Sequence, residues 1–74
     1  MTDVEVSVVL PAYNEEETIE RTVAVTLETL DDFLPAGSFE VIVAEDGCDD
    51  RTPEIAARLA AADARVRHCH SDDR

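Results

Sequence analysis

Two acidic segments of this chain carry the side chains best suited to chemistry. They are PAYNEEE at residues 11–17 and EDGCDD at residues 45–50, and a run of apolar and β-branched residues precedes each. Ionised carboxylates accept hydrogen bonds from the ring N–H groups of uracil or guanine and from ribose hydroxyls. The segments therefore suit a nucleoside, although a capped helix start and an ordinary polar turn explain the same spacing.

The first segment does not suit a phosphate. Folds that bind phosphate at their first helix start place glycines and unpaired backbone N–H groups there. Residues 11–17 contain no glycine, and Glu15 to Glu17 would repel a phosphate. We expect Pro11 and Tyr13 to flank a base or a ribose instead, with the diphosphate turned away toward a divalent metal.

The sequence HCH at residues 68–70 suggests zinc ligands. On a strand, however, His68, Cys69 and His70 would point to alternate faces, and a site would need partners such as Cys48 and one more ligand. We therefore predict no metal ligand in this chain. In the absence of a secretory context, we also expect both cysteines to be free reduced thiols.

The residues around the first segment predict a strand followed by a helix. Residues 5–10 are β-branched and end at Pro11, which is typical of a strand. Asn14 and Glu17 form a capping-box pattern, so a helix should begin there and end at about residues 31–34. Its apolar stripe comprises Ile19, Val23, Leu27, Leu30 and Leu34.

The second half of the chain repeats this order. Residues 39–46 are apolar on both faces, which indicates a parallel strand inside a covered sheet. After a turn, Thr52 is expected to cap a second helix with Pro53 at its first position. Residues 64–70 predict a shorter third strand. The inner stripe of the second helix comprises Ile55, Leu59 and Ala62.

Together these elements predict an α/β chain of order β-α-β-α-β with a parallel sheet. Crossovers between parallel strands are right-handed in nearly all proteins. If the strands follow one another outward, both helices lie on one face of the sheet and the other face stays bare. Because parallel sheets are normally covered on both faces, we expect residues 1–74 to form the first part of a larger α/β domain.

The charge of the chain excludes some partners. Its 74 residues include 18 acidic and 6 basic side chains, without a lysine, and carry a formal net charge of −12. This balance argues against binding nucleic acid or an anionic membrane through a basic surface. The acidic surface resembles those of proteins from salt-loving organisms, where salt screens self-repulsion. We expect the chain to loosen at low salt.

No targeting segment is visible at the start of the chain. The sequence MTDVEVSVVLP lacks the basic region of a signal peptide, and its apolar run is too short to span a bilayer. We therefore expect a cytoplasmic protein, or one that works at the cytoplasmic face of a membrane.

Two stretches resemble a known signature. VSVVLPAYNEEETI, followed by FEVIVAEDGCDDRT, is similar to the N-terminal signature of family 2 glycosyltransferases with the GT-A fold. The usual form is strand-P-x-Y-N-E, then E-hydrophobic-hydrophobic-V-D-D-G-S-x-D-x-T. The resemblance is greatest to the dolichyl-phosphate mannose or glucose synthase branch. It implies that residues 1–74 are the N-terminal, nucleotide-sugar-binding part of a Rossmann-like GT-A domain.

The resemblance also assigns roles to residues. It implies that Pro11, Tyr13 and Glu15 line the nucleoside pocket and that Asp46, the second of the family's Asp-Asp pair, contacts the base. Glu45 replaces the first Asp of that pair and is longer by one methylene.

Two further positions lie in the turn of the second motif. Cys48 replaces the usual Ser, a substitution of one small polar residue by another to which we assign a structural role. Asp50 matches the residue that helps to close this loop, and we expect it to accept local backbone hydrogen bonds.

The resemblance further implies a donor, an acceptor and a metal. The full enzyme would pass a sugar, with inversion, from a UDP or GDP sugar to an acceptor such as a polyprenyl or dolichyl phosphate. Mg²⁺ or Mn²⁺ would bind a D-x-D motif on a later strand, so we predict neither metal ligands nor catalytic residues here. Asp72 and Asp73 are expected to be a solvated loop. A non-catalytic remnant or a receiver-like α/β signalling module is the alternative.

Overall fold

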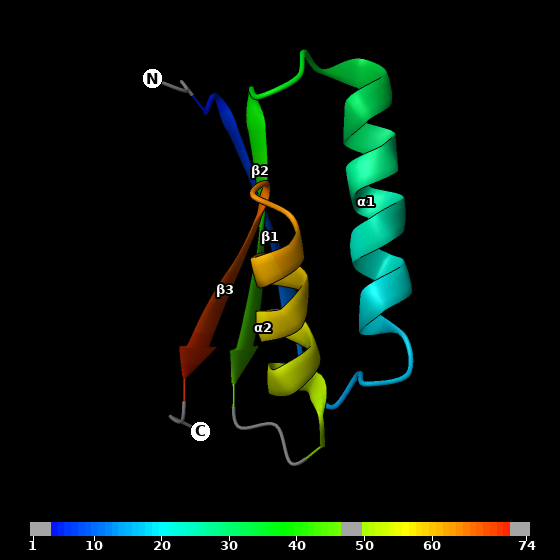
Figure 1. Ribbon diagram of the computed structural model, residues 1–74, viewed down its shortest axis with the longest axis vertical. Helices are drawn as coiled ribbons and strands as arrows, with labels where there is room; N and C mark the ends of the chain where they lie inside the picture. The colour runs from blue at the N-terminus through cyan, green and yellow to red at the C-terminus, as the bar shows by residue number, and fades with distance from the viewer. Residues whose placement is uncertain (1–3, 47–49, 72–74) are drawn as a thin grey trace.

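The chain folds as alternating strands and helices, as its sequence predicts (Figure 1). The computed structural model describes residues 4–46 and 50–71, so Cys48, Asp72 and Asp73 lie outside the described residues. The element order is β1 (Val6–Ala12), α1 (Ile19–Phe33), β2 (Phe39–Asp46), α2 (Thr52–Ala62) and β3 (Val66–Ser71). Within the described residues, no helix is long and apolar enough to cross a membrane.

The strands form one parallel sheet in the order β1-β2-β3. Val6 of β1 pairs with Phe39 of β2, and Val41 of β2 pairs with Val66 of β3. All the carboxyl ends therefore meet at one edge of the sheet, where the arrowheads lie in Figure 1. This edge is where parallel α/β sheets bind ligands.

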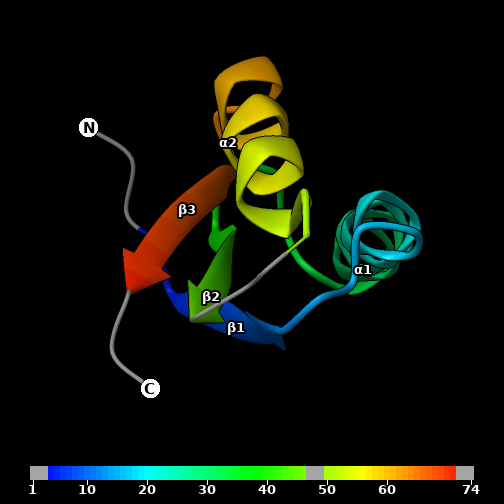
Figure 2. The ribbon, with the colours of Figure 1, turned by 90° about the horizontal axis from the view of Figure 1, so that it is seen from below.

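Both helices cover the same face of the sheet, which is called the helix face below (Figure 2). On β2, Phe39, Val41 and Val43 are buried under the helices, while the residues between them are only half-buried. The opposite, open face leaves Val9 of β1 56% exposed. The prediction of one covered and one bare face is confirmed.

The core lies between the sheet and the helices. It joins small and β-branched side chains of every element: Ala12, Ile19, Val23, Val43, Ala56 and Val66. Ile55 and Leu59 pack against this core as predicted, but Ala62 is exposed. The predicted inner stripe of α2 was wrong at Ala62, because the buried side of this helix runs through Thr52 and Ala56, four residues apart.

The first strand ends later than its sequence predicts. β1 continues through Pro11 and Ala12. A proline is tolerated because β1 lies at the edge of the described sheet, where an N–H on the outer side has no partner strand.

The first helix also begins later than predicted. Asn14 has a φ of 49°, a left-handed conformation that asparagine tolerates and that a helix cannot include. A turn follows, in which the Ile19 N–H donates to the Glu15 carbonyl at 2.8 Å. Thr18, rather than Asn14, precedes the helix, and it makes no side-chain cap. The capping-box prediction with Glu17 was therefore wrong.

Candidate functional site

A hollow of about 310 Å³ lies at the carboxyl ends of β1 and β2. Its lining includes the four residues that the sequence analysis assigned to a nucleoside pocket, together with two alanines. The lining residues are Pro11, Ala12, Tyr13, Glu15, Ala44 and Asp46. The structure thus brings together residues that are more than thirty positions apart in the sequence.

Strand register explains why these residues meet. Pro11 pairs with Ala44 across the β1–β2 ladder, and both lie on the open face. Asp46 lies two positions beyond Ala44, so strand alternation returns it to that same face. Tyr13 follows Ala12, the last residue of β1, and is 58% exposed beside the hollow. The hollow therefore has apolar walls, an aromatic ring and two carboxylates, which are groups that can hold a base and a ribose.

Two polar neighbours of the lining residues, Glu45 and Asn14, do not line this hollow. Glu45 is only 1% exposed and lies on the helix face, because successive side chains of a strand point to opposite faces. Asn14 lines a neighbouring hollow of about 300 Å³ with Glu15, Glu16, Glu17, Thr18 and Asp50. The carboxylates of that second hollow would repel a phosphate, in agreement with the sequence argument.

The loop after β1 is tied to the start of α2 by side chains. The Glu15 N–H donates to the Thr52 hydroxyl oxygen at 2.8 Å, and the Glu16 N–H donates to Asp50 Oδ2 at 3.1 Å. The Thr52 hydroxyl in turn donates to Asp50 Oδ1 at 2.6 Å. Asp50 and Thr52 therefore hold the backbone on which Glu15 enters the hollow. We call these contacts the loop tether.

The contacts of the loop tether confirm one prediction and show that another was wrong. Asp50 also accepts the Thr52 N–H at 2.9 Å, so its expected backbone hydrogen bonding is confirmed. The expected cap by Thr52 was wrong. Thr52 is the first residue of α2, and its fully buried side chain contacts the other loop instead. Sequence reasoning missed this link because nothing in either segment indicates which distant amide a threonine will contact.

Hydrogen bonding also sets the charge state of Asp50. Burial raises its pKa, but hydrogen bonds from the Thr52 hydroxyl, the Thr52 N–H and the Glu16 N–H outweigh burial and lower the pKa below its ordinary value. The ionised carboxylate is therefore the form that the loop tether stabilises.

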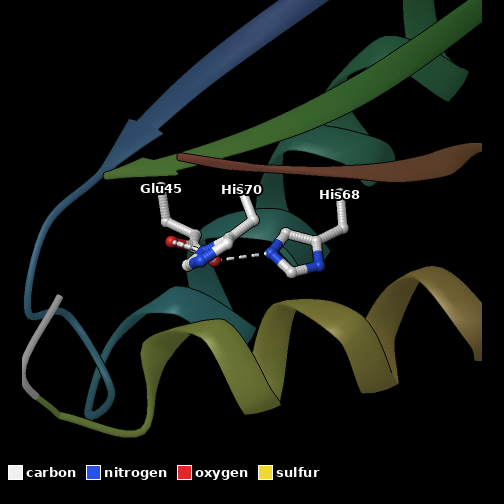
Figure 3. Close-up of side chains that lie close together, drawn as sticks. All are labelled: Glu45, His68 and His70. Atoms are coloured by element: carbon white, nitrogen blue, oxygen red, sulfur yellow. Dashed lines mark hydrogen bonds and ion pairs between the residues drawn. The ribbon is translucent and has the colours of Figure 1, made fainter. Parts of the chain in front are cut away.

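A second constellation lies behind Asp46, on the helix face. Glu45 Oε2 lies 2.7 Å from His68 Nε2 and 2.6 Å from His70 Nδ1. Figure 3 shows all three side chains pointing from the strands toward the helices. Cys69, between the histidines, is exposed and carries a free thiol, as expected. Sequence reasoning separated the histidines correctly from Cys69 but missed Glu45, although the pairing of Glu45 with His70 across β2 and β3 places them together.

The family resemblance implies Mg²⁺ or Mn²⁺, and the described residues do not fit these ions. Within residues 4–46 and 50–71, Glu45, His68 and His70 form the one group of at least three side chains placed to hold an ion. Mg²⁺ prefers oxygen ligands in octahedral geometry, whereas this group offers two imidazoles and one carboxylate. It also lies on the opposite face from the hollow that contains Asp46.

The sequence of this chain is similar to those of known glycosyltransferases. The chain is 79% identical over 71 residues to Glycosyltransferase AglD of Haloferax volcanii, covering 96% of this chain and 11% of that protein. It is 41% identical over 58 residues to Glycosyltransferase AglE of the same organism, covering 77% and 18%. It is 41% identical over 66 residues to EpsJ, an uncharacterized glycosyltransferase of Bacillus subtilis, covering 88% and 17%.

The chain spans less than a fifth of the length of each of these relatives. Residues 7–74 match the protein family described as Glycosyl transferase family 2, whose members generally use a divalent metal. This match includes both loops that form the hollow and favours a glycosyltransferase over a receiver-like module. The chain belongs to glycosyl transferase family 2.

Proposed function

We propose that residues 1–74 form the nucleoside-binding part of a glycosyltransferase that uses a nucleotide-diphosphate sugar. The hollow between β1 and β2 carries this proposal, because it gathers Pro11, Tyr13, Glu15 and Asp46 at the ligand-binding edge of a family 2 chain. Asp46 accepts hydrogen bonds from the base, Glu15 accepts them from the base or the ribose, and Tyr13 packs against the ring. A uracil or a guanine base meets these requirements equally.

The remaining steps of the proposed reaction involve groups outside the described residues. The sugar passes with inversion to an acceptor such as a polyprenyl or dolichyl phosphate, at the cytoplasmic side of a membrane. A bound Mg²⁺ or Mn²⁺ would supply the positive charge that stabilises the departing diphosphate, and we expect its ligands on a later strand. The acidic hollow beside Glu16 and Glu17 supports one part of this proposal, since it keeps the diphosphate away from the start of α1. Membership of the dolichyl-phosphate mannose or glucose synthase branch stays a prediction.

Calorimetric titration of the chain with a UDP sugar and a GDP sugar tests the nucleoside pocket. We expect one of the two to bind, and the Asp46→Asn variant to bind it about 10- to 100-fold more weakly. This loss corresponds to roughly 1.5–3 kcal/mol for a hydrogen bond to a charged group.

The matched control is Asp32→Asn, which removes an exposed carboxylate from the far end of α1. It removes the same charge and should leave affinity unchanged. Equal losses in both variants would show a general effect of net charge and would contradict the pocket. Failure of both sugar nucleotides to bind the folded chain would contradict it as well.

A further inference from the structure

The buried carboxylate of Glu45 is the least expected feature of this acidic chain. Its side chain is 0% exposed in a molecule with a formal net charge of −12. Burying an ionised carboxylate is costly unless positive charge or strong hydrogen bonds compensate it. Here the compensation comes from His68 and His70, whose ring nitrogens lie 2.6–2.7 Å from its oxygens.

These three side chains offer the donors of a transition-metal site. One ligand atom from each lies within 4.8 Å of the others. Two imidazole nitrogens and one carboxylate oxygen form the ligand set of zinc sites that keep one position open. The same set suits Co²⁺ and Ni²⁺, whereas an all-oxygen set suits Mg²⁺.

We propose that Glu45, His68 and His70 bind a divalent transition-metal ion, with Zn²⁺ as the reference ion. The ion takes the place of the hydrogen bonds that now join the two histidines to the carboxylate. This site is separate from the proposed nucleoside pocket, because it lies on the helix face and consists of different residues. Its ion is also softer than the Mg²⁺ or Mn²⁺ that the family resemblance implies. Its effect is to cross-link the ends of β2 and β3.

Two properties of the histidines support the proposal: solvent can reach them, and His70 has room to move. The His68 and His70 side chains are 19% and 46% exposed, so an ion can reach the site from solvent while Glu45 anchors it from inside. Tetrahedral ligands about 2.0–2.2 Å from zinc lie roughly 3.3 Å from one another. The two contacts between Glu45 and the histidines must therefore lengthen by about half an ångström, and the half-exposed His70 can supply this movement by turning its side chain.

Calorimetric titration of the folded chain with Zn²⁺, in molar KCl, tests the site. We expect one ion per chain, and the His70→Asn variant should bind it at least about tenfold more weakly. Loss of a partner that only orients a ligand already costs roughly 10–100-fold in affinity. Because His70 is half-exposed, this variant should keep its fold, which circular dichroism checks. Glu45→Gln, of the same size, should show a similar loss.

Three controls separate a site built by the fold from incidental binding. Cys69→Ser and Asp46→Asn should bind Zn²⁺ as the unmodified chain does, since neither side chain belongs to the group. A peptide of residues 64–74 contains both histidines without Glu45 and should bind at least about tenfold more weakly. Zn²⁺ should also raise the melting temperature of the chain but not that of His70→Asn.

Each contrary result overturns the proposal. Absence of Zn²⁺ binding by the folded chain leaves a hydrogen-bonded group of Glu45 with the two histidines and no metal function. Full affinity in Glu45→Gln or in the peptide shows incidental binding by the histidines. Lost affinity in Cys69→Ser shows a thiolate site instead. None of these results bears on sugar-nucleotide binding, which Asp46→Asn tests separately.

Discussion

Asp50 contributes to this molecule through hydrogen bonds that it accepts. One of its oxygens receives the Thr52 hydroxyl and N–H, and the other receives the Glu16 N–H. The same three donors lower its pKa in the folded chain against the opposing effect of burial. A carboxyl with a lower pKa in the folded state stabilises the fold above its unfolded pKa, and this stabilisation is lost as pH falls through the folded pKa.

The free energy of unfolding, measured as a function of pH, should therefore show the contribution of Asp50. The unfolded pKa of an aspartate is about 3.9, so the loss begins as pH falls below roughly 5 and continues below 3.9. We expect Asp50→Asn to be less stable than the unmodified chain at neutral pH and to lose less on acidification. Urea unfolding at a series of pH values measures this slope.

Asp32→Asn is the control for that slope and should keep it unchanged. Asp63 also has a lowered pKa, chiefly because the Arg65 side chain donates hydrogen bonds to it, so a residual slope is expected in Asp50→Asn. An acid slope identical in Asp50→Asn and the unmodified chain would show that the loop tether does not depend on the charge of Asp50.

At the scale of elements, strand β2 separates two kinds of chemistry. Its alternation sends Glu45 to the helix face, toward the histidines, and Asp46 to the open face, into the hollow. Hydrophobic pattern and turn residues predicted the strands, the helices and the parallel sheet. They could not predict which of the two adjacent carboxylates lines the hollow, because the strand is apolar on both faces.

The conformation of Asn14 and the contacts of Thr52 also could not be predicted from the sequence. Asn14 fits an N-cap by residue type, but its left-handed backbone belongs to a turn that the capping rule does not describe. The contacts of Thr52 with the loop after β1 are set by tertiary packing. The family resemblance therefore predicted the residues of the hollow, while contacts between distant segments determined how they are held.

Arg65 fastens the amino-terminal edge of the sheet to both helices. It donates to Asp63 and to Asp31 at 2.9 Å each, and its guanidinium lies 5.8 Å from the centre of the Phe39 ring. We expect Arg65→Ala to lower the free energy of unfolding by about 1–2 kcal/mol, from two partly exposed ion pairs and a cation–π contact. Urea denaturation measures the difference.

Arg58→Ala provides the comparison. Arg58 also joins α2 to α1, through Glu20, but both side chains are more than 60% exposed. Its loss should cost less than about 0.5 kcal/mol. Equal losses in the two variants would show that the burial and the ring contact of Arg65 add nothing.

At the scale of the whole molecule, the net charge of −12 has the largest electrostatic effect on stability. Within the described residues, Arg51, Arg58, Arg65 and Arg67 form five ion pairs, which compensate few of the 18 acidic side chains of the chain. Self-repulsion of the rest opposes folding, and salt shortens its reach to about 3 Å at 1 M. The chain should therefore be more stable in concentrated salt.

We expect the melting temperature to rise by roughly 4–8 °C between 0.1 M and 2 M KCl, as about 1 kcal/mol gives in a domain of this size. A variant with Glu17→Gln, Glu28→Gln and Asp32→Asn, all exposed positions, should show a smaller rise. A melting temperature that does not change with salt would refute the expectation.

The loop tether has a consequence for the thermodynamics of binding. Fixing the backbone of one residue costs about 1–2 kcal/mol of conformational entropy. Because Thr52 and Asp50 already hold the amides of Glu15 and Glu16, that entropy is lost when the chain folds and not when a ligand arrives. The affinity of the hollow is therefore partly determined at the start of α2, by Asp50 and Thr52, neither of which belongs to its lining. A substitution there would weaken binding through entropy, with every contact to the ligand still in place.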